Sequence, residues 1–403
     1  MKLNILVLTN EYPNEKYPKP DWTWVVPYFC REWVKQGHNV VVINNASSFP
    51  VIYYKLAGLF SKQVANYFDV SEEGLDETKW RTCFKFTDYG VRVFNLPMKK
   101  LVPGGEYSHG VILGQVLIIK QILDRNDYIP DVITGHWLNP QLRLITELRK
   151  YYNNAKTALV FHGDYSKKNC KKHKAGQMIH NVDFVGCRSK TACDEISQYL
   201  AIRKCFICAS GVPDEYVKDE TREKVFHADE LHVFTAGRLV KYKNIDAVIN
   251  ACTNSLSQYH LSIAGDGPLR NELEELSKGK GITEHVRFLG KIERDLVQEQ
   301  MRDADVFILI SDKETFGLVY LEAMLQGCIV VASYDGGVDG IIVDGENGFL
   351  CNQGDSRMLG EILRKIEALS RDEKAIISKR AIDTAREYTN SKVAERYLRN
   401  IGG

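Results

Sequence analysis

The chain has 403 residues, of which 53 are basic and 52 acidic, so its formal net charge is +1. This balance excludes a general nucleic-acid-binding protein, which needs a strong basic excess. Hydrophobic residues make up 44% and charged residues 26%, proportions typical of a soluble globular protein. A collagen, a disulfide scaffold and an integral membrane bundle are excluded on the same grounds. At about 100–200 residues per domain, the length predicts two or three domains.

The N-terminal apolar run, residues 3–8, is short and lacks a small-residue cleavage site after it. We therefore interpret it as a first strand and not as a signal peptide. No stretch of the sequence reaches the ~18–20 apolar residues of a membrane-spanning helix. These features lead us to expect a cytoplasmic protein.

Ten cysteines are scattered along the chain, and one pair, Cys205 and Cys208, has C-x-x-C spacing. No second C-x-x-C or H-x-x-x-H motif completes a zinc site around this pair. The pair lies in a short apolar run that is typical of a strand. We therefore expect buried thiols here.

Short apolar runs alternate with longer amphipathic segments. The runs cover residues 5–8, 40–43, 132–134, 159–161, 184–186, 233–235, 261–264, 286–289, 306–310 and 329–332. Continuous apolar runs indicate strands buried on both faces, and their alternation with helices indicates parallel sheets. So many strands predict two Rossmann-like domains in tandem. Turn residues near 210–214 place the boundary, so we predict domains at 1–215 and 216–380 and a helical segment at 381–403.

Residues 311–324 are the richest in chemical groups. They follow a predicted strand and open a helix near Gly317, the context in which backbone N–H groups and the helix dipole receive a phosphate. Glu322 shares the apolar stripe of this helix with Leu318, Leu321 and Leu325. A carboxylate facing a core costs several kcal/mol unless it is paired. The Glu322 carboxylate either accepts a hydrogen bond from a neighbouring N–H or Arg, or it binds a pair of ligand hydroxyls. Glu314, just before the helix, favours the second interpretation.

Two further turns follow predicted strands of the second domain. In the first, Gly237-Arg238-Leu239 and Lys243 place a planar cation and a point charge together, a combination suited to a diphosphate. The alternative is a pair of solvated surface cations. In the second, Gly265 and Gly267 allow a ligand to approach the backbone closely.

In the first domain, His136 and His162 each lie at the end of a predicted strand. This is the edge at which α/β sheets place their ligands. The alternative for each histidine is structural, a turn capped by the imidazole. Two histidines at equivalent strand ends suggest a site more strongly than one would.

Together these elements resemble glycosyltransferase family 4, the glycosyl transferases group 1, which are retaining enzymes of the GT-B type. Glu314 and Glu322 look like the Glu-x7-Glu signature of that family, and Arg238 with Lys243 resembles its diphosphate clamp. Further landmarks stand in the expected order: Gly37-His38-Asn39-Val40, Gly265-Asp266-Gly267-Pro268, Arg287-Phe288-Leu289-Gly290 and Ala304-Asp305-Val306.

The resemblance implies an α/β protein of GT-B fold, with two Rossmann-like, doubly wound parallel-sheet domains facing a cleft. The first domain would bind the acceptor and the second the nucleotide sugar, and the C-terminal helix would cross back to the first domain. The implied site residues follow the family motifs. The diphosphate would be held by Arg238, Lys243 and the amides of Leu318 and Val319, beside Gly317 and Gly265. Glu322 would bind the ribose, and the base would contact Lys291, Ile292 and Glu293. The transferred sugar would contact Glu314 and His136.

The implied reaction moves a sugar from a UDP- or GDP-sugar to a hydroxyl of a glycan or lipid-linked acceptor, with retained anomeric configuration, in surface polysaccharide biosynthesis. It would need no cofactor and no metal. Asp303-Ala304-Asp305 has the Asp-x-Asp form of the metal site in GT-A glycosyltransferases, but it reads here as a helix end followed by a strand start. Nucleic acid is not an expected partner.

Three alternatives remain open: a sugar-nucleotide epimerase, a glycan phosphorylase on a similar scaffold, and a nucleotide-sugar-binding module without catalysis. A separate hypothesis concerns the basic run 167–174 and the aromatic segment 51–68. Both could touch the anionic inner face of a membrane, because lysines and aromatic residues favour that interface. The alternative is a solvated helix face and a partly buried loop.

Overall fold

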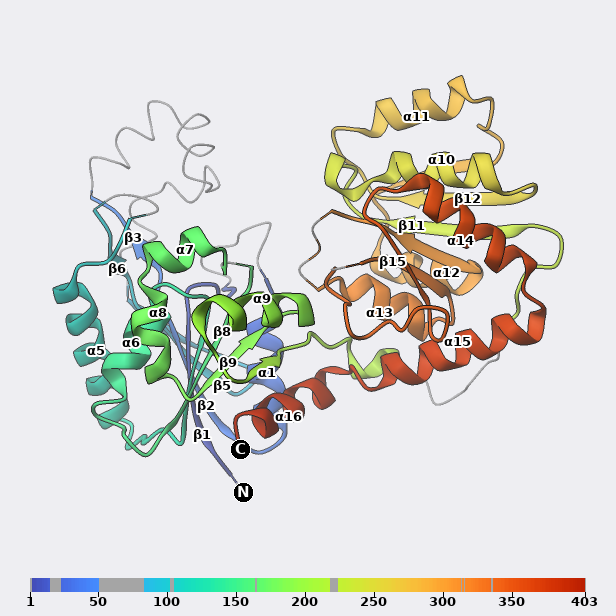
Figure 1. Cartoon of the computed structure of the whole chain (residues 1–403). Coiled ribbons are helices and arrows are strands. Elements are labelled where there is room, and N and C mark those ends of the chain that lie inside the picture. The colour runs from blue at the N-terminus through green and yellow to red at the C-terminus, as the bar shows by residue number, and fades with distance from the viewer. Residues whose placement is uncertain are drawn as a thin grey trace. The chain divides into compact units, whose positions relative to one another are not determined.

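The computed structural model describes residues 2–14, 23–50, 83–101, 105–163, 165–217, 224–312, 314, 316–334 and 336–402. By internal packing the chain divides into two compact units. Unit 1 comprises Met1–Arg188, Ala192–Cys208 and Ala394–Gly403, and unit 2 comprises Ser189–Thr191 and Ala209–Val393 (Figure 1). The last residues of the chain thus belong to the first unit. Segment 51–68, named above for its aromatic residues, lies outside the described residues.

Unit 1 is built on an eight-stranded sheet with the order β10-β9-β8-β7-β1-β2-β5-β4. Its strands are β1 (Asn4–Thr9), β2 (Asn39–Asn44), β4 (Phe84–Asp88), β5 (Val91–Asn95), β7 (Val132–His136), β8 (Lys156–Val160), β9 (Phe184–Cys187) and β10 (Cys205–Ile207). All neighbours are parallel except β4 and β5. A separate parallel pair joins β3 (Ser47–Ser48) and β6 (Met98–Lys99).

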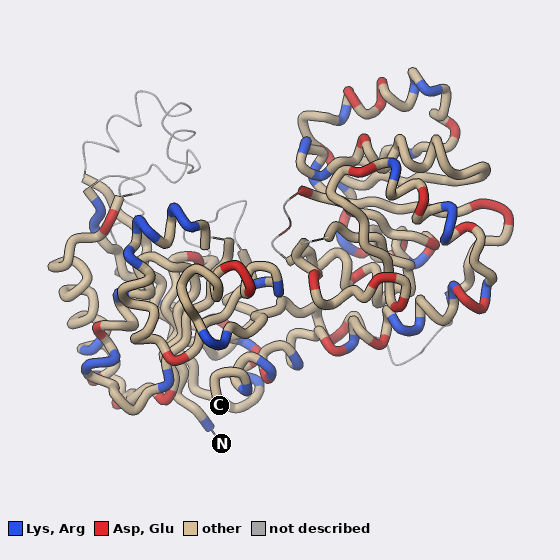
Figure 2. The backbone as a smooth tube through the Cα atoms, viewed as in Figure 1, with Lys and Arg blue, Asp and Glu red and all other residues tan. Residues whose placement is uncertain are grey.

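Helices cover both faces of this sheet. They are α1 (Val25–Lys35), α5 (His109–Asp124), α6 (Gln141–Leu148), α7 (Lys167–Lys172), α8 (Ala175–Met178), α9 (Lys190–Leu200) and α16 (Asn390–Asn400), with a short η2 (Ile179–Asn181). One apolar cluster joins α5, α6, α8 and α9 to the sheet. On α1 and α16, Trp33 and Tyr397 meet with ring centroids 5.2 Å apart, and Trp33 Nε1 donates to the Ala394 carbonyl at 3.0 Å. Figure 2 shows the basic residues along α7.

Unit 2 is built on a six-stranded sheet in which every neighbouring pair is parallel, with the order β13-β12-β11-β14-β15-β16. Its strands are β11 (Leu231–Ala236), β12 (Tyr259–Ala264), β13 (Val286–Gly290), β14 (Val306–Leu309), β15 (Ile329–Ser333) and β16 (Phe349–Cys351). Counted along the chain of this unit, the order is 3-2-1-4-5-6, that of a Rossmann domain. Ligands of such sheets bind beyond the carboxyl ends of the strands, at the switch point between β11 and β14.

The helices of unit 2 form two layers around the sheet (Figure 1). One layer contains α10 (Ile245–Ser255), α11 (Arg270–Gly279) and α14 (Ser356–Ala368), and the other contains α12 (Arg294–Asp303), α13 (Leu318–Leu325) and α15 (Arg371–Arg386). The short η3 (Asp214–Tyr216) and η4 (Lys241–Lys243) lie in the connections. Within the described part of the chain, every helix is too short or too polar to span a lipid bilayer.

All ten apolar runs fall on strands, so the predicted doubly wound α/β architecture is confirmed. The sequence does not predict β4, β5 or β16. The segment predicted to be helical at 381–403 is divided between two helices, because α15 ends at Arg386 and α16 starts at Asn390. Between them the backbone pairs with Val212, whose N–H donates to the Tyr388 carbonyl at 2.9 Å and whose carbonyl accepts from the Asn390 N–H at 2.8 Å. These bonds replace helical ones.

Candidate functional site

The turns after β11 and β12 are pressed together at the carboxyl edge of the unit 2 sheet. The N–H of Gly237 donates to the Ala264 carbonyl at 3.0 Å, and the N–H of Leu239 donates to the Asp266 carbonyl at 3.0 Å. Gly265 has a φ of +130°, and a Cβ at this position would lie 1.8 Å from the Gly237 carbonyl oxygen. A side chain is therefore sterically excluded at Gly265. The two turns expose backbone without a side chain at this position, beside the switch point.

The loop after β14 turns sharply into α13. Gly317 precedes the helix with a φ of +74°, and a Cβ there would come 2.4 Å from the ring of Tyr320. The first amides of the helix, those of Leu318 and Val319, lack acceptors within the helix, and both residues are half-buried. Because the positive end of the helix dipole lies at the same place, this turn can receive an anion.

The two predicted cations differ in their surroundings. Lys243, at the end of η4, donates from Nζ to Glu314 Oε2 at 2.5 Å, and both side chains are largely buried. Arg238 is exposed, and no ion pair is seen for it within the described ranges. Asn244 ties η4 to the loop after β14, because its Nδ2 donates to the Ile310 carbonyl at 2.9 Å. The structure thus brings Lys243 and Glu314 together beside the start of α13.

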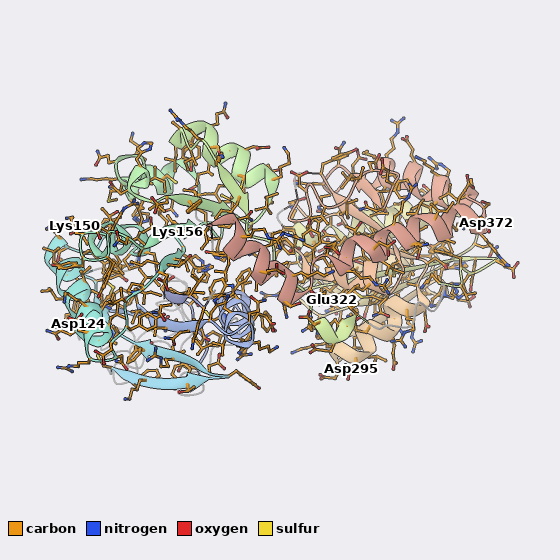
Figure 3. The ribbon with its side chains drawn as sticks, turned by 90° about the horizontal axis from the view of Figure 1, so that it is seen from below. Asp124, Lys150, Lys156, Asp295, Glu322 and Asp372 are labelled. Atoms are coloured by element: carbon orange, nitrogen blue, oxygen red, sulfur yellow. The ribbon has the colours of Figure 1, made fainter. Side chains whose placement is uncertain are left out.

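Glu322 is buried, and each of its carboxylate oxygens accepts one hydrogen bond from a protein side chain. Arg294 Nη2 of α12 donates to Oε1 at 2.5 Å, and Gln298 Nε2 donates to Oε2 at 3.1 Å. Gln326 in turn donates to Gln298 Oε1 at 2.9 Å, and the Arg294 guanidinium lies 5.2 Å from the centre of the Tyr216 ring. Figure 3 labels Glu322 among the helices of unit 2. The Arg cap is thus present, and the carboxylate is held in one orientation.

Sequence reasoning missed Arg294 and Gln298. They stand four residues apart at the start of α12, so they lie on one face of that helix and can reach the same carboxylate. That spacing was the available signal. Lys291, Ile292 and Glu293 form the link from β13 to α12 at the same edge of the sheet, where Lys291 and Glu293 are exposed and Ile292 is half-buried.

The Asp-x-Asp sequence has a structural role, as predicted. Asp303 ends α12, and Asp305 directly precedes β14. The Asp305 carboxylate is buried and accepts from the backbone N–H of His227 at 3.0 Å and from that of His232 at 2.8 Å. It therefore anchors the chain that enters β11.

In unit 1, His136 and His162 are hydrogen-bonded to each other. His136 is the last residue of β7 and is completely buried, and its Nδ1 lies 2.8 Å from His162 Nε2. Burial, with a smaller contribution from the Arg188 charge, lowers the pKa of His136 to about 3. His162 is half-buried and stacks on Trp137 with ring centroids 4.4 Å apart. The His162 ring is therefore the one of the pair that a ligand of unit 1 can reach.

Comparison with known proteins agrees with this geometry. Residues 217–385 match the family described as Glycosyl transferases group 1. The chain is 32% identical over 161 residues to the sulfoquinovosyl transferase SQD2 of Arabidopsis thaliana, a match that covers 39% of this chain and 30% of that protein. It is 27% identical over 282 residues to the alpha-monoglucosyldiacylglycerol synthase of Streptococcus pneumoniae, covering 66% of this chain and 63% of that protein. The chain thus spans less than two thirds of the length of either relative.

A solved structure shares the arrangement over the full length. Anabaena Alr3699/HepE, crystallised in complex with UDP, superimposes with a TM-score of 0.66 at 16% identity and covers 100% of both chains. At this identity the likeness concerns the fold. Residues 217–385 of the chain thus resemble the glycosyl transferases group 1 family, and the fold is that of the GT-B glycosyltransferases.

Proposed function

We propose that the chain is a retaining glycosyltransferase whose unit 2 binds a nucleotide sugar. The observation that carries the proposal is the Lys243–Glu314 pair, which lies beside the amino end of α13 at the carboxyl edge of a Rossmann-ordered sheet. A cation, a carboxylate and the first turn of a helix lie there at the usual ligand position of such sheets.

The diphosphate of the donor is assigned to Arg238, Lys243 and the amides of Leu318 and Val319. Lys243 is paired with Glu314, and a diphosphate would take over this cation and leave the carboxylate free for a sugar hydroxyl. Arg238 is exposed and can fold over the phosphates. Two cations and a helix end stabilise the charge that develops on a leaving diphosphate, so we expect transfer without a divalent metal.

The nucleoside is assigned to the neighbouring part of the same edge. Glu322 is held by Arg294 and Gln298, so its oxygens are oriented for the ribose hydroxyls. Residues 291–293 would meet the base. The UDP bound in the Anabaena relative supports a uridine donor, and a GDP-sugar is the other candidate.

In the proposed reaction the bond from the anomeric carbon to the diphosphate breaks, and a bond to the acceptor oxygen forms on the same face. The acceptor proton passes to the leaving phosphate oxygen, which balances the charge. Glu314 is assigned to the transferred sugar, and His136 stays a prediction for contact with it.

The acceptor is proposed to be a hydroxyl of a glycan or of a lipid-linked molecule. The S. pneumoniae relative is named for a diacylglycerol product, and another relative, LpsE of Rhizobium meliloti, for lipopolysaccharide core biosynthesis. Both names support an amphiphilic acceptor and a role in assembling surface polysaccharide or glycolipid.

The test is thermal unfolding with UDP, GDP, ADP and their sugars. A ligand that binds the folded state stabilises it by RT ln(1 + [L]/Kd), about 2.7 kcal/mol at 100 Kd. We expect stabilisation by one base family, lost in Arg238→Ala and kept in Arg357→Ala, an exposed arginine on α14. A product assay with the selected donor then follows.

Two results would contradict the proposal. If no nucleotide stabilises the wild type, the diphosphate site is wrong. If nucleotide is released from the donor without any acceptor and the sugar is converted to its epimer, the chain is an epimerase.

A further inference from the structure

Three cysteine side chains converge in unit 1, away from the residues discussed above. Cys187, Cys193 and Cys205 place their sulfur atoms within 4.8 Å of one another. Cys187 and Cys193 are buried, and Cys205 is half-buried. The C-x-x-C partner suggested by spacing, Cys208, is not in the group and instead lies against Arg188.

The sheet and one helix create this convergence. Cys187 ends β9 and Cys205 starts the adjacent parallel strand β10, where Cys205 pairs with Val185 and Ile207 with Cys187. Alternate residues of a strand share a face, so both thiols point to the same side of the sheet. Cys193 lies near the amino end of α9, which packs on that side.

From this geometry we propose that Cys187, Cys193 and Cys205 bind one thiophilic metal ion of the zinc type as a three-thiolate site. Sulfur atoms bound to Zn²⁺ at about 2.3 Å lie about 3.8 Å apart, so side chains within 4.8 Å need only small rotations to close on the ion. The half-buried Cys205 leaves an access path and a fourth position for water. Binding would release the thiol protons.

The surroundings favour a thiolate in this group. Cys193 lies near the amino end of α9, where the positive end of the helix dipole favours a thiolate. A structural ion of this kind is separate from the transfer reaction, for which no metal is expected.

The ion would fasten the edge of the sheet. β10 is only three residues long, and within the described residues its one partner strand is β9. A metal held from β9, α9 and β10 would tie this short edge strand to the helix that covers it. Any stabilisation would follow the mass-action relation for a ligand that binds only the folded state.

The experiment uses the full chain, purified under reducing conditions, incubated with Zn²⁺ and desalted. Elemental analysis should find about one zinc per chain, and cadmium in place of zinc should give the ultraviolet absorption of metal–thiolate bonds. Both signals should be lost in Cys193→Ser and in Cys205→Ser. Cys170→Ser is the matched control, because Cys170 is a buried thiol of the same apolar cluster outside the group.

Three outcomes would overturn the proposal. In the first, the wild-type protein binds no zinc. In the second, both variants keep the zinc or the cadmium absorption. In the third, protein purified without reductant contains a disulfide between two of the three cysteines and takes up zinc neither before nor after reduction. If circular dichroism shows that Cys193→Ser does not fold, the result for Cys205→Ser decides the test, because Cys205 is half-buried and its substitution should disturb the fold less. Retained zinc in that folded variant would overturn the proposal.

Discussion

Lys243 and Glu314, separated by 71 positions in the sequence, form a 2.5 Å ion pair between η4 and the loop before α13. Both side chains are largely buried, so the pair is desolvated more than a surface ion pair. A desolvated cation that gives up its carboxylate must receive another anion. The incoming diphosphate meets that requirement, and this exchange is the basis of the first prediction.

Glu314→Gln should separate binding from turnover. The amide no longer neutralises Lys243, so UDP affinity is expected to hold or rise, while transfer falls by about 10²–10³-fold if Glu314 contacts the sugar in the transition state. Calorimetry and a product assay measure the two quantities. Glu361→Gln, at an exposed position on α14, is the control. Unchanged turnover in Glu314→Gln would mean that Glu314 only pairs with Lys243 and does not contact the sugar.

Glu322→Gln tests the ribose assignment. A charged acceptor is lost, so UDP affinity should fall about tenfold, or ~1.4 kcal/mol, while pyrophosphate affinity stays the same. Gln298→Met removes one protein partner of the carboxylate but keeps the charge, and it should retain UDP binding. Equal losses for UDP and pyrophosphate in Glu322→Gln would mean that the residue only supports the fold.

Gly265→Ala should damage both the fold and the nucleotide site. The methyl group would lie 1.8 Å from the Gly237 carbonyl oxygen in a backbone region that L residues avoid, so we expect a loss of at least about 2–3 kcal/mol in the free energy of unfolding. Gly279→Ala, at the end of α11 with no atom within 4 Å of the added carbon, should change stability by less than about 1 kcal/mol. Urea unfolding compares them, and similar effects would contradict the close approach.

The stability of unit 1 should depend on His136 at acidic pH. Burial lowers the pKa of this imidazole to about 3, whereas the unfolded chain binds the proton near pH 6.5. The unfolded state therefore binds more protons between pH 6.5 and 3, and stability falls as pH falls through this window. One such group costs on the order of 2 kcal/mol between pH 7 and 5.

His136→Gln should flatten this part of the pH profile, measured by urea unfolding at pH 7 and 5. His109→Gln is the control, since His109 is exposed at the start of α5. An identical loss on acidification in wild type and His136→Gln would show that other groups titrate there, and His162, whose pKa burial lowers as well, is the next to change.

The lysines of α7 offer a test of membrane contact. Lys167, Lys168, Lys171 and Lys172 are all exposed, while Cys170 is buried in the apolar cluster of unit 1. If they meet anionic lipid, the chain should float with phosphatidylserine vesicles at low salt and be released at high salt. Changing these four lysines to Gln should abolish flotation, and changing Lys278 and Lys280 at the end of α11 should not. No flotation of the wild type would end the hypothesis.

Much of the fold could be predicted because strand burial leaves a local trace. A strand covered on both faces, such as β1, β7 or β15, contains a continuous run of apolar residues, and this pattern needs only neighbouring residues to be recognised. The order of glycine turns, cations and glutamates along the chain likewise led to the family. The sequence did not predict β4, because this strand lies at the sheet edge and its residues alternate between half-buried and exposed.

By itself, then, the sequence determined the two parallel-sheet domains and the resemblance to the glycosyl transferases group 1 family, while the roles of the site residues that it suggests stay predictions. The tertiary structure alone decided which side chains meet: Lys243 with Glu314, Arg294 with Glu322, and Cys205 with Cys187 and Cys193 rather than with Cys208. Periodicity is set by contacts a few residues apart along the chain. Side-chain pairing is set by strand order and helix packing, which bring together residues that no local pattern connects.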